Sequence, residues 1–180
     1  IKEKKWKEFR KYGFTSAHLA PSQGIFRGTG PCILLHDKFD QQMILKDAVA
    51  QVIAFDPVGR KSSPSIYPNS LMGVLSAIRQ TLLETIHARE MLSFEKTNPS
   101  TKPFYVHDGM RSLLQNLGPT HSSPTWFETG SMSMNAKASE IAQEFDLQDI
   151  TLILSGDEWR RPDLSISRRH DCILPLNFPS

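Results

Sequence analysis

The chain has 180 residues, of which 39% are hydrophobic and 22% are charged. This length suffices for one domain with a sizeable core, and this composition is typical of a globular chain rather than a disordered one. The formal net charge of +2 is too small to favour a nucleic-acid partner. No apolar run approaches the ~20 residues that span a bilayer. We therefore expect neither a nucleic-acid partner nor a membrane span.

Cys32 and Cys172 lie far apart and match no CxxC pair and no zinc-finger spacing. Two buried free thiols are the simpler interpretation, and a single disulfide stays open, so the redox compartment is undecided. The sequence starts at Ile1 and shows no signal peptide. We expect either that such a peptide was removed or that the start of the gene is missing.

The first predicted element is an amphipathic helix over residues 2–12, ended by Gly13. Residues 14–20 follow as a strand, and their small and apolar side chains suit a buried parallel strand. Pro21 breaks this strand. The loop after it contains three glycines within seven residues: Gly24, Gly28 and Gly30. A strand that runs into a glycine-rich loop is a common way for an α/β domain to build a site.

Residues 31–55 change in character, with three short runs rich in Ile, Val and Leu: CILLH, MILK and AVAQVIAF. Polar, turn-like residues separate the runs. This pattern predicts a small antiparallel β insertion over residues 31–55.

The longest predicted helix covers residues 69–94, with Asn69 or Ser70 as its cap. Its apolar residues recur at the spacing of one helix face. They are Leu71, Val74, Leu75, Ile78, Leu82, Ile86 and Met91. This stripe predicts a helix that covers a sheet.

The remainder of the chain alternates between helix and strand patterns. The predicted order is helix 108–117, strand 124–130, helix 133–145, strand 149–156, short helix 157–163 and strand 172–178. Strands that alternate with helices at this pace predict right-handed crossovers and a parallel sheet.

Several of these segments resemble the amidohydrolase superfamily, in particular its imidazolonepropionase-related branch. The first resembles that branch's second barrel strand and its glycine-rich loop, and reads FRKYGFTSAHLAPSQGIFRGTG. The start of the long helix resembles the branch's Y-P-x-S-L-M-G segment and reads YPNSLMGVLSAIRQTL. The later strand and helix units follow in the same order, as PTWFETGS, EIAQEFDL, ITLILSGDEW and CILPLNFP.

The resemblance implies a (β/α)8 barrel whose metal site lies at the carboxyl ends of the strands. It implies that a divalent metal, most often zinc, activates water to attack a C–N bond of a small-molecule substrate. A whole barrel needs ~250 residues, so we expect an α/β chain that forms about half of a TIM-type barrel, with the remainder of the same polypeptide as its partner. An exported or periplasmic location is a further implication, which the sequence neither supports nor opposes.

The family's ligand pattern is not met within these residues. The His-x-His pair would precede Ile1 and the last-strand aspartate would follow Ser180, so neither has a counterpart here. At the two middle histidine positions stand Glu128 and Ser155. Glu128 suits a hard cation, whereas Ser155 is a poor zinc ligand. No metal ligand is therefore assigned, and two functions stay open: a C–N hydrolase when complete, and a barrel that lost its ligands and serves as a binding module.

Glu128 is the candidate catalytic residue, as a general base or ligand, because it ends a predicted strand. The alternative is a structural carboxylate paired with a nearby Lys or Arg. Arg27, Gly28 and Gly30 are candidate substrate-binding residues, with the guanidinium holding an anionic group. The alternative is a tight turn with a solvated Arg27. His18, near the end of the first strand, is the best-placed histidine for contact with substrate.

Overall fold

The computed structural model describes residues 3–36, 43–55, 68–99, 102–116, 123–156, 160 and 170–176. The elements are α1 (Glu3–Lys11), β1 (Ser16–His18), β2 (Phe26–Thr29), β3 (Cys32–Leu34), β4 (Ile44–Lys46), β5 (Gln51–Ala54), α2 (Leu71–Thr97), α3 (Asp108–Asn116), β6 (Thr125–Glu128), α4 (Met132–Glu144), β7 (Ile150–Ile153) and β8 (Asp171–Ile173). The short helix predicted over residues 157–163 lies outside the described residues, apart from Arg160.

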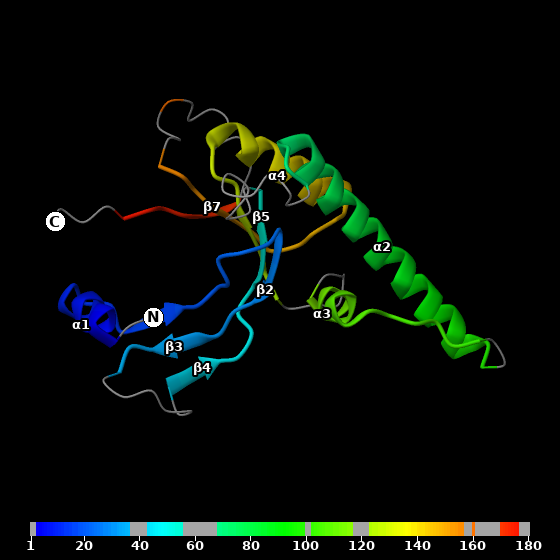
Figure 1. Ribbon diagram of the computed structural model, residues 1–180, viewed down its shortest axis with the longest axis horizontal. Coiled ribbons are helices and arrows are strands. Elements are labelled where there is room, and N and C mark those ends of the chain that lie inside the picture. Colours follow the sequence, from blue (N-terminus) through cyan, green and yellow to red (C-terminus); the bar gives the residue numbers. More distant parts are fainter. Residues whose placement is uncertain are drawn as a thin grey trace.

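A five-stranded sheet in the order β2-β5-β6-β7-β8 forms the centre of the molecule (Figure 1). Strands β5, β6, β7 and β8 run parallel, and β2 pairs antiparallel with β5 at one edge. The parallel sheet predicted from the alternation of helices and strands is therefore confirmed. The carboxyl ends of its parallel strands meet at one edge of the sheet, where α/β proteins place their sites.

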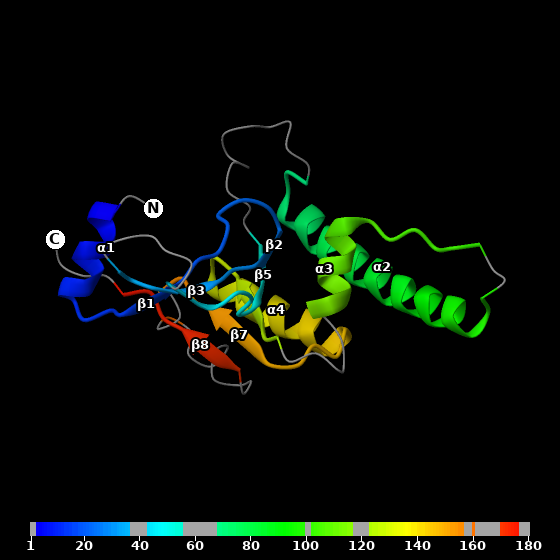
Figure 2. The same cartoon turned by 90° about the horizontal axis from the view of Figure 1, so that it is seen from below.

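A second, three-stranded antiparallel sheet in the order β1-β3-β4 lies beside the first, close to α1 (Figure 2). The small sheet is connected to the edge of the main sheet by two short links. One link joins β2 to β3, and the other joins β4 to β5. The two sheets thus share one long hairpin, which bends where the chain passes Gly30 and Ala50. Both residues are buried at this bend.

The prediction of a buried parallel strand over residues 14–20 is wrong. Strand β1 covers only Ser16–His18, pairs antiparallel with β3, and leaves Ser16 exposed. Small residues fit a half-covered strand in a two-layer unit as well as a buried parallel strand, so composition did not separate these cases.

The predicted β insertion over residues 31–55 is correct for its first two runs and wrong for its third. Strands β3 and β4 pair antiparallel in the small sheet. Strand β5, however, joins the main sheet and pairs parallel with β6. All four residues of Gln51–Ala54 are buried, and burial on both faces of a parallel sheet explains the continuous apolar run that ends there.

Helices α2 and α4 lie on one face of the main sheet (Figure 1). The core between helices and sheet comprises buried residues of both layers: Ile53, Phe55, Val74, Leu75, Ile78, Leu82, Leu113, Phe127, Ala138, Ile141, Ala142, Ile150, Leu152 and Leu154. A separate small core of Trp6, Ile33, Leu35 and Met43 holds α1 against the small sheet. None of the described helices is long and apolar enough to cross a membrane.

Helix α2 begins after Ser70, whose side-chain oxygen accepts a hydrogen bond from the Gly73 amide (3.1 Å). This confirms one of the two predicted caps. The apolar stripe is correct as far as Leu82, whereas Ile86 is exposed and Thr85 is buried instead. Thr85 tolerates burial because its hydroxyl donates to the Thr81 carbonyl (2.7 Å).

Candidate functional site

Glu128 is the last residue of β6 and lies at the carboxyl edge of the sheet, as the sequence predicted. It stands level with Ala54 of β5 and Ile153 of β7. Side chains alternate along a strand, and Phe127 packs into the core under the helices. Glu128 therefore points to the opposite face of the sheet, which would be the inner face if the sheet closed into a barrel.

Arg27 and Glu128, both singled out in the sequence, form an ion pair in which Arg27 Nη1 donates to Glu128 Oε2. They come from β2 and β6, so the guanidinium crosses the intervening strand β5. The Arg27 side chain is 5% exposed and that of Glu128 is 41% exposed. The accessible member of the pair is thus the carboxylate, and the arginine is its buried anchor.

Arg27 reaches this position because β2 is irregular at this residue. The register between β2 and β5 shifts between Phe26 and Gly28, and Arg27 lies at that bulge. Bulges redirect a side chain next to many sites. Arg27 Nε also donates weakly to the Gly24 carbonyl (3.4 Å). Among the described residues, Nη2 has no acceptor, so one donor of this buried guanidinium is unused.

The candidate glycines have local roles in the backbone. Gly28 has φ of +72°, in the left-handed region that favours glycine. A Cβ at Gly30 would lie 1.7 Å from the Leu19 carbonyl oxygen, so no side chain fits there. Residues Phe26–Thr29 are a strand rather than the predicted loop. Substrate binding by Gly28 and Gly30 stays a prediction.

His18 lies on the same face of the main sheet as Glu128 but contacts a different residue. Its ring meets the Trp126 ring edge-on, with centroids 4.7 Å apart. Burial lowers the pKa of His18, and a backbone hydrogen bond with Gly30 partly opposes that shift. The imidazole is therefore kept neutral near pH 7. Its predicted contact with substrate stays a prediction.

Trp126 was overlooked in the sequence, although the signal was available. In a strand, residues two apart share a face, so Trp126 must lie beside Glu128. The structure shows both half-buried on the face away from the helices. Together with His18 they form an aromatic and charged surface next to the carboxyl edge.

Thr129 and Asn135, also overlooked, connect the end of β6 to the start of α4. The Thr129 hydroxyl donates to Asn135 Oδ1, and both residues are buried. The Ser139 hydroxyl donates to the Asn135 carbonyl (3.0 Å). These hydrogen bonds connect the residue that follows Glu128 to the first turns of α4.

The implied metal does not fit the residues described here. Among them, no group of three or more His, Cys, Asp or Glu side chains converges on one point. Glu128, the candidate ligand, is already paired with Arg27. Ser155 is exposed after β7 and offers no charge. A zinc site at this edge would need ligands from outside the described residues.

Comparison with known proteins identifies the fold. No family model matches the sequence, and no curated protein matches it. The structure is similar to a solved structure, an amidohydrolase from Thermotoga maritima MSB8, with a TM-score of 0.72 and 16% sequence identity. The similarity covers 91% of this chain and 42% of the Thermotoga chain. The chain therefore has a fold found in part of an amidohydrolase, and it spans less than half the length of that protein.

Proposed function

We propose that this chain forms part of the barrel wall of an amidohydrolase-like enzyme that hydrolyses amide or cyclic amide C–N bonds of a small molecule. The observation that carries the proposal is the position of the Arg27–Glu128 pair. It lies at the carboxyl edge of a parallel sheet, on the face opposite α2 and α4, in a fold shared with part of an amidohydrolase. Barrel enzymes of this type place their chemistry at that edge.

In this proposal Glu128 faces the substrate and Arg27 does not. The buried guanidinium pairs with one carboxylate oxygen and fixes its position. The other oxygen is left to accept a hydrogen bond from an amide N–H, or to take a proton as a base. Arg27 is then a positioning residue rather than the anion-binding residue that the sequence suggested.

Activation of water is assigned to groups outside the described residues, since these residues alone do not form a metal site. The resemblance to the imidazolonepropionase-related branch is the basis for proposing zinc in the complete protein. It is also the basis for proposing that the remainder of the polypeptide completes the barrel.

The test is hydrolysis by the complete polypeptide, measured on a panel of linear and cyclic amides. Glu128→Gln should lower kcat/KM at least tenfold with the fold retained by circular dichroism. Glu144→Gln is the matched control, because Glu144 also pairs with an arginine (Arg79, 2.7 Å) but on the helix layer. Equal activity of the two variants would exclude Glu128 from catalysis.

A second function is a binding module that lost its metal ligands. The Arg27–Glu128 pair favours this alternative, since the one carboxylate at a family histidine position is occupied by a structural partner. Metal analysis of the complete protein separates the two proposals. Stoichiometric zinc together with hydrolysis supports the enzyme, and a metal-free, inactive, folded protein supports the binding module.

A further inference from the structure

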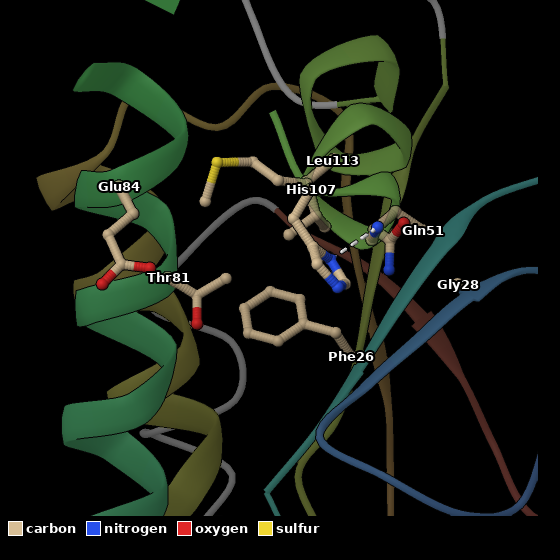
Figure 3. A pocket seen from close by; sticks show the side chains of 9 residues that line it. Phe26, Gly28, Gln51, Thr81, Glu84, His107 and Leu113 are labelled. Atoms are coloured by element: carbon tan, nitrogen blue, oxygen red, sulfur yellow. Dashed lines mark hydrogen bonds between the residues drawn. The ribbon is translucent and has the colours of Figure 1, made fainter. Parts of the chain in front are cut away.

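We propose that a pocket on the helix-covered side of the sheet binds a small planar cation, such as an aromatic amidine or a protonated nitrogen heterocycle. The pocket has a volume of about 450 Å³, within the range of small-molecule sites. It is bounded by β2, β5, α2 and α3 (Figure 3). The sheet separates it from the Arg27–Glu128 pair, so this inference does not rest on the proposed function.

The apolar part of the pocket suits a flat ring. Phe26 projects from β2 toward α2, and Leu113 of α3 lies on another side of the pocket (Figure 3). Met110 of α3 also lines the pocket. Phe26 and Met110 are only partly buried, so their apolar surface is available for contact. A ligand ring placed against the Phe26 ring gains burial and stacking energy.

The charge of the pocket selects a cation. Glu84 of α2 is exposed at the pocket. Among the described residues that line the pocket, Glu84 is the one carboxylate and none is a Lys or an Arg. Glu84 Oε1 accepts a hydrogen bond from Gln80 Nε2 (2.8 Å), which leaves Oε2 for a ligand. A carboxylate at the edge of an apolar pocket attracts a cation and repels an anion.

Two further polar groups set the hydrogen-bonding pattern. His107 Nδ1 accepts from the Gly109 amide (3.2 Å), so in the neutral ring Nε2 carries the proton and is a donor. Gln51 is fully buried at the start of β5, and its Nε2 donates to the Val52 carbonyl (3.2 Å). Among the described residues, Gln51 Oε1 has no donor. A buried acceptor without a donor is costly, which favours a ligand that brings an N–H group to this side.

The test uses benzamidinium as the probe and benzoate as its anionic counterpart, titrated into the chain by isothermal calorimetry. We expect benzamidinium to bind with a Kd of roughly 0.1–1 mM, a typical affinity for a ligand of this size. Benzoate should bind at least tenfold more weakly. Equal binding of the two ions, or no binding of benzamidinium, would overturn the proposal.

Two pairs of variants locate the binding. Met110→Trp fills the pocket and should abolish binding, whereas Met72→Trp, at an exposed position of α2 (72%), should not. Glu84→Gln should weaken binding about threefold, as expected for a partly exposed ion pair, and Glu90→Gln on the same helix should leave it unchanged. Binding that survives Met110→Trp would place the cation elsewhere, for instance at Glu128, and would contradict the assignment.

Discussion

The two faces of the five-stranded sheet use the same four-residue strand β6 in different ways. On the helix-covered face, Thr125 and Phe127 are almost fully buried, and the Phe127 ring meets the Phe55 ring edge-on at 5.8 Å. On the opposite face, Trp126 contacts a histidine and Glu128 pairs with an arginine. On the first face β6 presents two buried side chains without an ionisable group, whereas on the second face its side chains have partners that carry or can gain charge.

From this difference we expect the helix-covered face to contribute mainly to stability and the opposite face mainly to function. Substitutions on the helix-covered face should act on the free energy of unfolding through lost packing. Substitutions on the opposite face should change the free energy of unfolding by leaving a buried polar or charged group without its partner. The four predictions below test that division, in order of decreasing expected effect.

The largest effect is expected for Phe127→Ala, which removes a fully buried ring from the main core. It should lower the free energy of unfolding by about 3–5 kcal/mol. Trp126→Ala removes a larger ring from the other face, but a half-buried one, and should cost clearly less. Urea titrations of both variants measure the difference. A greater cost for Trp126→Ala would mean that the opposite face is the better packed one.

Removing Glu128 from the Arg27–Glu128 pair should lower the free energy of unfolding more than removing Arg27. Glu128→Gln leaves a guanidinium that is 5% exposed without its counter-ion, at an expected cost of about 3 kcal/mol. Arg27→Met leaves a carboxylate that water still reaches, so about 1 kcal/mol is expected. The double variant should recover part of the larger loss, and chemical denaturation of all three measures it. Equal single costs would argue against Arg27 being the buried partner.

The helix layer depends on a local cap as well as on packing. Ser70→Ala removes the acceptor for the Gly73 amide and should lower the free energy of unfolding by about 1 kcal/mol. Ser76→Ala, at an exposed position inside α2, is the matched control and should be neutral or slightly stabilising. Thermal melts of the two variants compare them. A neutral Ser70→Ala would show that packing alone holds the start of α2.

The smallest effect should be a pH dependence that originates at His18. Burial lowers its pKa below the ordinary value of 6.5, so the unfolded chain binds the proton more readily than the folded chain. The contribution of neutral His18 to the free energy of unfolding is therefore fully present above pH 6.5. It decreases as the pH falls from 6.5 through the lowered pKa of the folded state. His18→Gln should remove this part of the dependence, and His87→Gln on α2 should not. Urea midpoints between pH 5 and pH 8 measure it. A stability that rises on acidification would contradict the sign.

The sequence alone determined the elements whose signals are local. The Ser70 cap, the apolar stripe of α2 as far as Leu82 and the β6–α4–β7 alternation depend on neighbours a few residues apart, and these were predicted correctly. The position of Glu128 at a strand end followed from the same local reasoning. Periodicity and capping depend on residues within one element, so they can be recognised in a single sequence.

Only the tertiary structure decided which strands pair and which charges meet. Arg27 and Glu128 lie 101 residues apart, and their contact depends on a bulge in β2 and on β5 lying between their strands. The same holds for β1, which could join either sheet by its composition, and for the pocket that Phe26 shares with α2 and α3. Contacts of this kind arise from the register and packing of distant segments, for which the sequence carries no local signal.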